Sequence, residues 1–160
     1  MATITKNRIR HSNAISGAPY GDATCKVYSL ELNSSGACKD SNSTSAVQIG
    51  DKIRIGVIPG GTQLVDELAI ISDPFASGTT FGIGYEYVDG IDDAKVPQDS
   101  EFFHGSVSGA TSGRRSMSNY DSRPITLPKD AYLTVTVKGS AQSSSAALDV
   151  VLFGNIKGII

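Results

Sequence analysis

The stretch DKIRIGVIPGGTQLVDELAIISD, residues 51–73, decides the fold class. Apolar residues alternate with polar residues or glycine from residue 52 to 58, the period of two that places one face of a β-strand in a core. Pro59 cannot donate a backbone hydrogen bond and Gly60–Gly61 permits positive φ, so we expect a hairpin turn there. Residues 62–73 also fit helical spacing, but the turn before them and the Ser-Asp-Pro at their end favour a second strand.

The same alternation recurs on both sides of this stretch. Turn-rich loops separate about eight such segments, and runs of helix-forming residues are few, which predicts an all-β fold, an antiparallel sandwich or a barrel. The alternation places the following residues in the core: Tyr28, Leu30 and Leu32; Ile53, Ile55 and Val57; Phe81, Ile83, Tyr85 and Tyr87; Leu133, Val135 and Val137; Leu148, Val150 and Leu152.

Two regions lack this periodicity. Residues 1–20 are polar, and we interpret them as an extended N-terminal arm, disordered when free or laid on a neighbouring subunit in an assembly. Residues 21–160 then form a single β-sandwich domain, a length usual for one domain. Within it, residues 89–123 have no clear pattern and predict a long functional or partly disordered loop, with EFFHGSV as a short strand or an anchoring turn.

Charge and composition exclude several classes of partner. The 14 basic and 16 acidic residues are balanced, which disfavours nucleic acid and anionic membranes as partners. No apolar run is long enough for a membrane span, and MATITKNRIRH has no apolar core of a secretory signal, so we expect synthesis in the cytoplasm. Cys25 and Cys38 are then expected as reduced thiols, and two cysteines without nearby histidines cannot complete a zinc site.

The sequence carries little catalytic chemistry. Neither His11 nor His104 has a partner at metal-ligand spacing, and we interpret His104 as a surface or packing residue. No Gly-x-Ser-x-Gly elbow and no Gly-x-x-x-x-Gly-Lys-Ser/Thr loop is present. We therefore expect no enzyme activity, no catalytic residue, no metal site and no cofactor.

An acidic cluster offers oxygen ligands for calcium, but its spacing does not match an EF-hand, and we interpret it as part of a solvated loop. The cluster consists of Asp89, Asp92, Asp93, Asp99 and Glu101.

The order of these segments resembles a group of small structural proteins of tailed bacteriophages. The segments that carry the resemblance are DKIRIGVIPGGTQL, VDELAIISD, SGTTFGIGYEYVDG, DAYLTVTVKGSA and LDVVLFGNIKG, within residues 45–157. The resemblance implies a jelly-roll-like antiparallel β-sandwich on the virion. It also implies a non-enzymatic protein that decorates or cements the capsid surface, with related chains at the head–tail junction or on fibres.

The partners implied are the major capsid protein and the chain itself, as a homodimer or homotrimer. We expect capsid contacts from Lys6, Arg8 and Arg10 in the arm, and from Arg114 and Arg115 in the polar 105–123 loop. A carbohydrate-binding sandwich is the alternative. It would use exposed aromatic platforms, often tryptophan, and this chain has no tryptophan.

Overall fold

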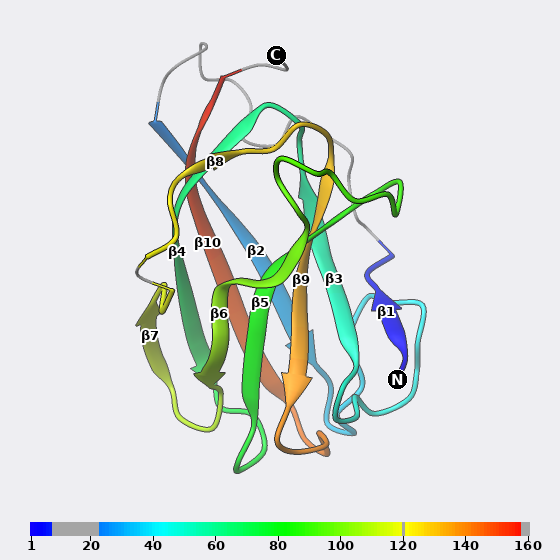
Figure 1. Ribbon diagram of the computed structural model, residues 1–160. Coiled ribbons are helices and arrows are strands. Elements are labelled where there is room, and N and C mark those ends of the chain that lie inside the picture. The colour runs from blue at the N-terminus through cyan, green and yellow to red at the C-terminus, as the bar shows by residue number, and fades with distance from the viewer. Residues whose placement is uncertain (8–22, 120, 158–160) are drawn as a thin grey trace.

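The computed structural model describes residues 1–7, 23–119 and 121–157 (Figure 1). Two β-sheets face each other, with strand orders β1-β3-β9-β5-β6 and β2-β10-β4-β7, and β8 pairs with β4 beside the second sheet. The strands are β1 (Thr3–Thr5), β2 (Ala23–Leu32), β3 (Lys52–Ile58), β4 (Thr62–Asp73), β5 (Thr80–Tyr87), β6 (Asp99–Ser108), β7 (Gly113–Ser116), β8 (Ile125–Thr126), β9 (Ala131–Lys138) and β10 (Ala146–Ile156).

The strand order is that of a jelly roll. Apart from the short β1 and β8, eight strands form two four-stranded sheets, β3-β9-β5-β6 and β2-β10-β4-β7, and the chain passes from one sheet to the other at most connections. Every pairing is antiparallel except that of β1 with β3. The described part of the chain has no helix that could cross a membrane. These observations confirm the predicted antiparallel sandwich of about eight strands.

The turn at residues 59–61 exists, but the predicted hairpin is wrong. β3 pairs with β1 and β9, whereas β4 pairs with β10, β7 and β8, so this turn connects the two sheets. The Gly60 N–H donates to the Asp130 carboxylate at 2.8 Å, and the Gly61 N–H donates to the Leu127 carbonyl at 2.7 Å. Because the turn is fixed to the β8–β9 connection, the two strands diverge instead of pairing.

The core lies between the sheets and contains all the residues that the alternation predicted. Their side chains are at most 6% exposed, the largest value belonging to Ile55. Each buried Leu, Ile, Val or aromatic side chain stabilises the fold by about 1.5–3 kcal/mol relative to exposure. The segment with ambiguous periodicity, residues 62–73, is the strand β4 and places Leu64, Ala69 and Ile71 in this core.

The unpatterned region 89–123 contains two strands, so the interpretation of EFFHGSV as a strand is confirmed, whereas the prediction of one long loop is wrong. β6 and β7 both lie here, and β6 pairs with β5 over a ladder with two register shifts. These irregularities break the period of two, so that the consecutive residues Phe103 and His104 are both buried. β6 therefore has no clean alternation in its sequence.

The start of the predicted arm is part of the sandwich. Residues 3–5 form β1 beside β3, and the Ile4 side chain is 1% exposed in the core. The buried Ile4 side chain thus helps to anchor residues 1–7 to their own subunit, together with hydrogen bonds such as that from Lys6 to Ser29. Residues 8–20, with Arg8, Arg10 and His11, lie outside the described residues. Cys25 and Cys38 are both free thiols, as expected.

Candidate functional site

Lys6, predicted as a capsid contact, is bound within its own subunit. Its ammonium donates to the Ser29 carbonyl at 2.8 Å, and the residue is half-buried. The Lys6 N–H also donates to the Arg54 carbonyl at 3.4 Å. Lys6 therefore links the end of β1 to the edge of β2, and its ammonium group already makes a hydrogen bond within the subunit.

Arg114 and Arg115 lie on β7, an edge strand, and not in a loop as predicted. Arg114 is exposed and stands opposite Ile70 in the ladder with β4. No hydrogen bond or ion pair of its side chain is found within the described residues. Arg115 is half-buried and donates to the Thr111 hydroxyl at 2.8 Å. Arg114 is thus the cation of this pair that can meet a partner without losing an internal contact.

Lys6 and the two arginines of β7, which are the predicted contact residues that the structure describes, do not form one surface. β1 lies at one edge of the first sheet and β7 at the far edge of the second, on opposite sides of the molecule in Figure 1. A partner that contacts both must therefore span the sandwich, or two partners are involved.

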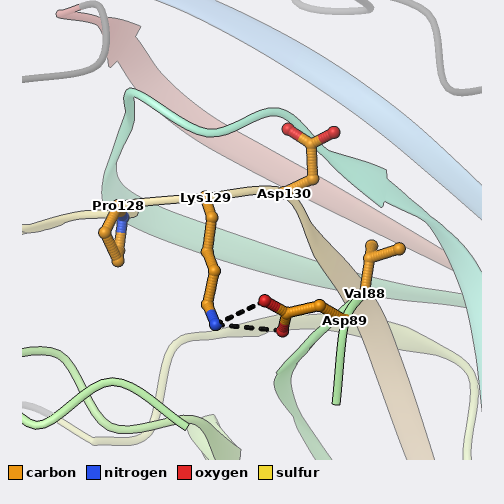
Figure 2. Close-up of a pocket in the computed structure, with 5 residues that line it drawn as sticks. All are labelled: Val88, Asp89, Pro128, Lys129 and Asp130. Carbon is orange, nitrogen blue, oxygen red and sulfur yellow. Dashed lines mark hydrogen bonds and ion pairs between the residues drawn. The ribbon is translucent and has the colours of Figure 1, made fainter. Parts of the chain in front are cut away.

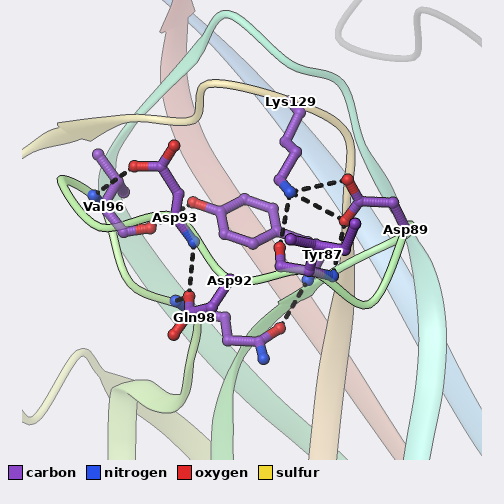
Figure 3. Close-up of polar contacts among 8 residues, drawn as sticks. Tyr87, Asp89, Asp92, Asp93, Val96, Gln98 and Lys129 are labelled. Carbon is purple, nitrogen blue, oxygen red and sulfur yellow. Dashed lines mark hydrogen bonds and ion pairs between the residues drawn. The ribbon is translucent and has the colours of Figure 1, made fainter.

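The acidic segment 89–98 is a loop held by its own aspartates and by Lys129, as Figure 3 shows. The Lys129 ammonium pairs with the Asp89 carboxylate at 2.7 Å and donates to the Ile91 carbonyl at 2.6 Å. One Asp92 oxygen accepts from the Gln98 N–H at 2.7 Å, and one Asp93 oxygen from the Val96 N–H at 2.9 Å.

These contacts engage the carboxylate oxygens of the acidic loop. The hydrogen bond from Lys129 holds the pKa of Asp89 below its usual range, and bonds from the backbone N–H groups of Val96 and Lys95 do the same for Asp93. Their oxygens are thus engaged in stabilising turns. The described residues include no group of three or more potential metal ligands.

Beside this loop lies an open hollow, shown in Figure 2. It is lined by Val88, Asp89, Pro128, Lys129 and Asp130. The Lys129 ammonium stacks over the Tyr87 ring at 4.6 Å and is neutralised by Asp89. Lys129 and Asp89 thus neutralise each other in the hollow. The five lining residues place no acid and base beside a common substrate position.

A buried polar chain joins the two sheets. His104 of β6 contacts Glu67 of β4 through Nε2 and Oε2 at 2.6 Å, and both side chains are 0% exposed. On its other side, His104 Nδ1 lies 3.0 Å from the Ser118 hydroxyl. Burial raises the pKa of Glu67, and the hydrogen bond and charge of His104 oppose that rise. The structure therefore gives His104 the packing role that the sequence analysis allowed.

Glu67 was not identified from the sequence, although a signal was present. Glu67 lies in line with the buried Ala69 and Ile71 at alternate positions of β4. An acid in the inward register of a strand demands a buried partner. The register shift in the ladder between β4 and β10 obscured this alignment, because it separates Glu67 from the earlier inward residue Leu64.

The Ser–His–Glu chain resembles the relay of a serine hydrolase, but its surroundings differ. Such a relay needs free N–H donors for the developing oxyanion beside the nucleophile. The N–H groups of Ser118 and Asn119 both donate to the Phe103 carbonyl, at 3.1 and 3.3 Å. The Asn119 side-chain amide donates to the carbonyls of Glu101 and Phe102. The adjoining donors are thus engaged, and the chain acts as a tie between sheets.

Three aromatic residues of β5 lie in the core and form no exposed platform for a sugar. Phe81, Tyr85 and Tyr87 are at most 1% exposed, and Tyr85 and Tyr87 bond through their hydroxyls to the carbonyls of Pro97 and Val96. Burial raises the pKa of Tyr87 to about 12. These rings stabilise the core and hold the 89–98 loop against it.

Comparison with known proteins gives matches in structure alone. No family model matches the sequence, and no curated protein matches it. A chain in the capsid structure of Ralstonia phage GP4 superposes with a TM-score of 0.66 at 15% identity, covering 99% of both chains. The chain has a fold found in phage capsids. A chain of the cyanophage Pam1 capsid asymmetric unit superposes with a TM-score of 0.59 at 12% identity, covering 93% of this chain and 98% of the other.

These likenesses confirm the fold that the sequence resemblance implied. Because they extend over nearly the whole of each chain, they concern the complete jelly roll and not a shared fragment.

Proposed function

We propose that this chain is a structural protein of a phage virion, which binds capsid subunits on the particle surface without catalysis and so decorates or cements the head. The observation that carries the proposal is the likeness over 99% of both chains to a chain of the Ralstonia phage GP4 capsid. The engaged side chains of the acidic loop and of the Glu67–His104 pair are consistent with a binding role.

The physical requirements of cementing agree with this structure. A cement protein needs a rigid body that holds its shape while it bridges subunits, and the sandwich has a continuous core between its sheets. Each contact can be weak, because a molecule bound to one capsid subunit meets the next at high effective concentration. The major capsid protein is the proposed partner, and the chain reaches it after synthesis in the host cytoplasm.

The proposed capsid contact within the described residues is β7, with Arg114 as its exposed cation. An exposed ion pair contributes only about 0.2–1 kcal/mol, but a charge-reversed residue also repels the partner. We expect particles assembled with Arg114→Glu to carry less of this chain than wild-type particles. Lys95→Glu, an equal change of net charge on the 89–98 loop, serves as the matched control.

Particle occupancy is measured by mass spectrometry of purified virions, and folding of each variant by circular dichroism. If particles carry Arg114→Glu and wild type at equal occupancy, β7 is not part of the capsid contact. The arm residues Arg8 and Arg10 are tested in the same way with Arg8→Ala/Arg10→Ala.

A further inference from the structure

β2 is an edge strand, and part of its outer side has no partner among the described residues. All ten of its residues pair with β10, and the ladder has no register shift. On the other side, the Ser29 carbonyl accepts from Lys6 and the Glu31 carbonyl accepts from the Lys39 N–H at 2.8 Å. The odd-numbered residues of β2 therefore direct their backbone groups away from β10.

The same alternation directs the N–H and C=O groups of Cys25 and Val27 outward. No backbone partner of these two residues on that side is found among residues 1–7, 23–119 and 121–157. Unpaired edge groups of this kind form a template for another strand. The open part of the edge is residues 23–27, because Lys6 and Lys39 close it from Ser29 onward.

This edge also lacks the usual protection against pairing. Edge strands are commonly guarded by charge, proline, bulges or short length. β1 has three residues, β7 has four, and β6 has register shifts. Residues 23–27 contain no proline, and the single charged side chain, Lys26, lies over the Tyr28 ring at 4.9 Å. Val27 points outward with 54% of its side chain exposed.

We infer that a second copy of this chain pairs with β2, antiparallel and across a two-fold axis at Cys25. A symmetric pair centred there uses all three open positions, residues 23, 25 and 27, in both copies, because 23 meets 27 and 25 meets 25. The exposed side chains at Cys25 and Val27 are uncharged, so identical edges meet without the repulsion that opposed like charges cause. Two-fold pairing of identical surfaces is the commonest form of homo-oligomer.

The pairing joins the second sheet of one copy to the second sheet of the other, which gives the strand order β7-β4-β10-β2-β2-β10-β4-β7. It also makes a geometric prediction. Facing residues whose backbone groups bond each other lie about 5.5 Å apart between Cα atoms, within the range of roughly 4.4–6.8 Å that a disulfide requires. Cys25, exposed in the single chain, therefore reports on the dimer, whereas Cys38 is 4% exposed and does not.

The first test is the mass of the purified full chain by sedimentation velocity in reducing buffer. We expect a dimer for wild type and a monomer for Val27→Pro, since proline removes an N–H that no described contact within the subunit uses. Val27→Thr keeps the N–H and a β-branched side chain, and should remain dimeric. Circular dichroism establishes that each variant is folded.

The second test needs no change in the strand. Diamide, which takes up the two electrons and two protons released by a pair of thiols, should cross-link wild type and Cys38→Ala rapidly into covalent dimers. Cys25→Ser should stay uncross-linked. A Cys25→Ser/Ser144→Cys variant, with its thiol on an exposed loop, gives the rate of random collision.

A monomeric wild type that cross-links no faster than this collision control overturns the inference. The inference also fails if wild type is monomeric in solution and Val27→Pro is absent from purified particles. That result would assign the β2 edge to contact with a capsid subunit. Both tests use the isolated chain in solution, so dimerisation stands or fails independently of the proposed virion function.

Discussion

The buried pair of His104 and Glu67 gives the sharpest test of what holds the two sheets together. Both side chains are 0% exposed and 2.6 Å apart, and the second Glu67 oxygen, Oε1, has no hydrogen-bond partner among the described residues. Replacing His104 by leucine leaves the acid alone in the core. Breaking a buried pair in this way costs about 3–5 kcal/mol. Because burial already raises the pKa of Glu67, the acid can take up a proton, which moderates the loss.

The double variant Glu67→Leu/His104→Leu should be more stable than the sum of the two single variants predicts. An apolar pair of similar volume requires no buried charge, and such replacements are often neutral or stabilising. Residues in contact commonly show coupling energies of about 0.5–3 kcal/mol. Urea denaturation of the wild type, both single variants and the double variant at pH 7 measures this coupling, provided that the m-values agree.

Two results would refute this reasoning. One is an additive cycle, with no coupling beyond about 0.5 kcal/mol, the agreement usual for independent sites. The other is a loss below about 0.5 kcal/mol for His104→Leu, because a change that small is typical of a surface site and not of a buried partner.

Three further predictions concern single residues. The pKa of Glu67 is raised in the folded state, so its favourable effect on the free energy of unfolding is fully present below the unfolded pKa of about 4.3 and is lost as pH rises through the folded pKa. Wild type should therefore lose stability relative to Glu67→Gln above about pH 4, as measured by urea denaturation across a pH series. Gly56→Ala places a Cβ 2.1 Å from the Tyr28 ring and should cost about 1–3 kcal/mol in thermal or urea unfolding, whereas Gly105→Ala, with 3.4 Å to its nearest neighbour, should cost less. Lys129→Ala should speed proteolytic cleavage of the 89–98 loop, and an unchanged cleavage pattern would show that the loop does not depend on this lysine.

The sequence predicted the central strands of the sandwich and the edge strand β2, but little of the edge strands β6 and β7. The central strand β9 has neighbours on both sides, and its buried Leu133, Val135 and Val137 alternate with threonine and lysine, so the period of two is visible in its sequence. β6 and β7 have one neighbour each, and the bulged ladder of β6 removes the alternation. The turn at residues 59–61 was visible locally, but its role as a link between sheets depends on Asp130 and Leu127, which are distant in sequence.

The candidate site, too, was predicted only in part from the sequence. The exposure of Arg114 follows from a polar stretch in the sequence, whereas the internal bond of Lys6 to Ser29 depends on how β1 docks beside β3. The Glu67–His104 pair joins residues from different sheets, so the inward register of Glu67 predicts a buried partner but does not identify it. The open edge of β2 follows from strand order, which alternation alone cannot give because it carries no information about neighbours.

The most direct test of the proposed virion role is a count of this chain in purified particles of the phage that encodes it, by quantitative mass spectrometry against the major capsid protein. Decoration or cementing of the head predicts a copy number on the same scale as that of the major capsid protein. Only the few copies typical of a portal or a fibre would contradict decoration, and absence from the particle would contradict the virion role itself.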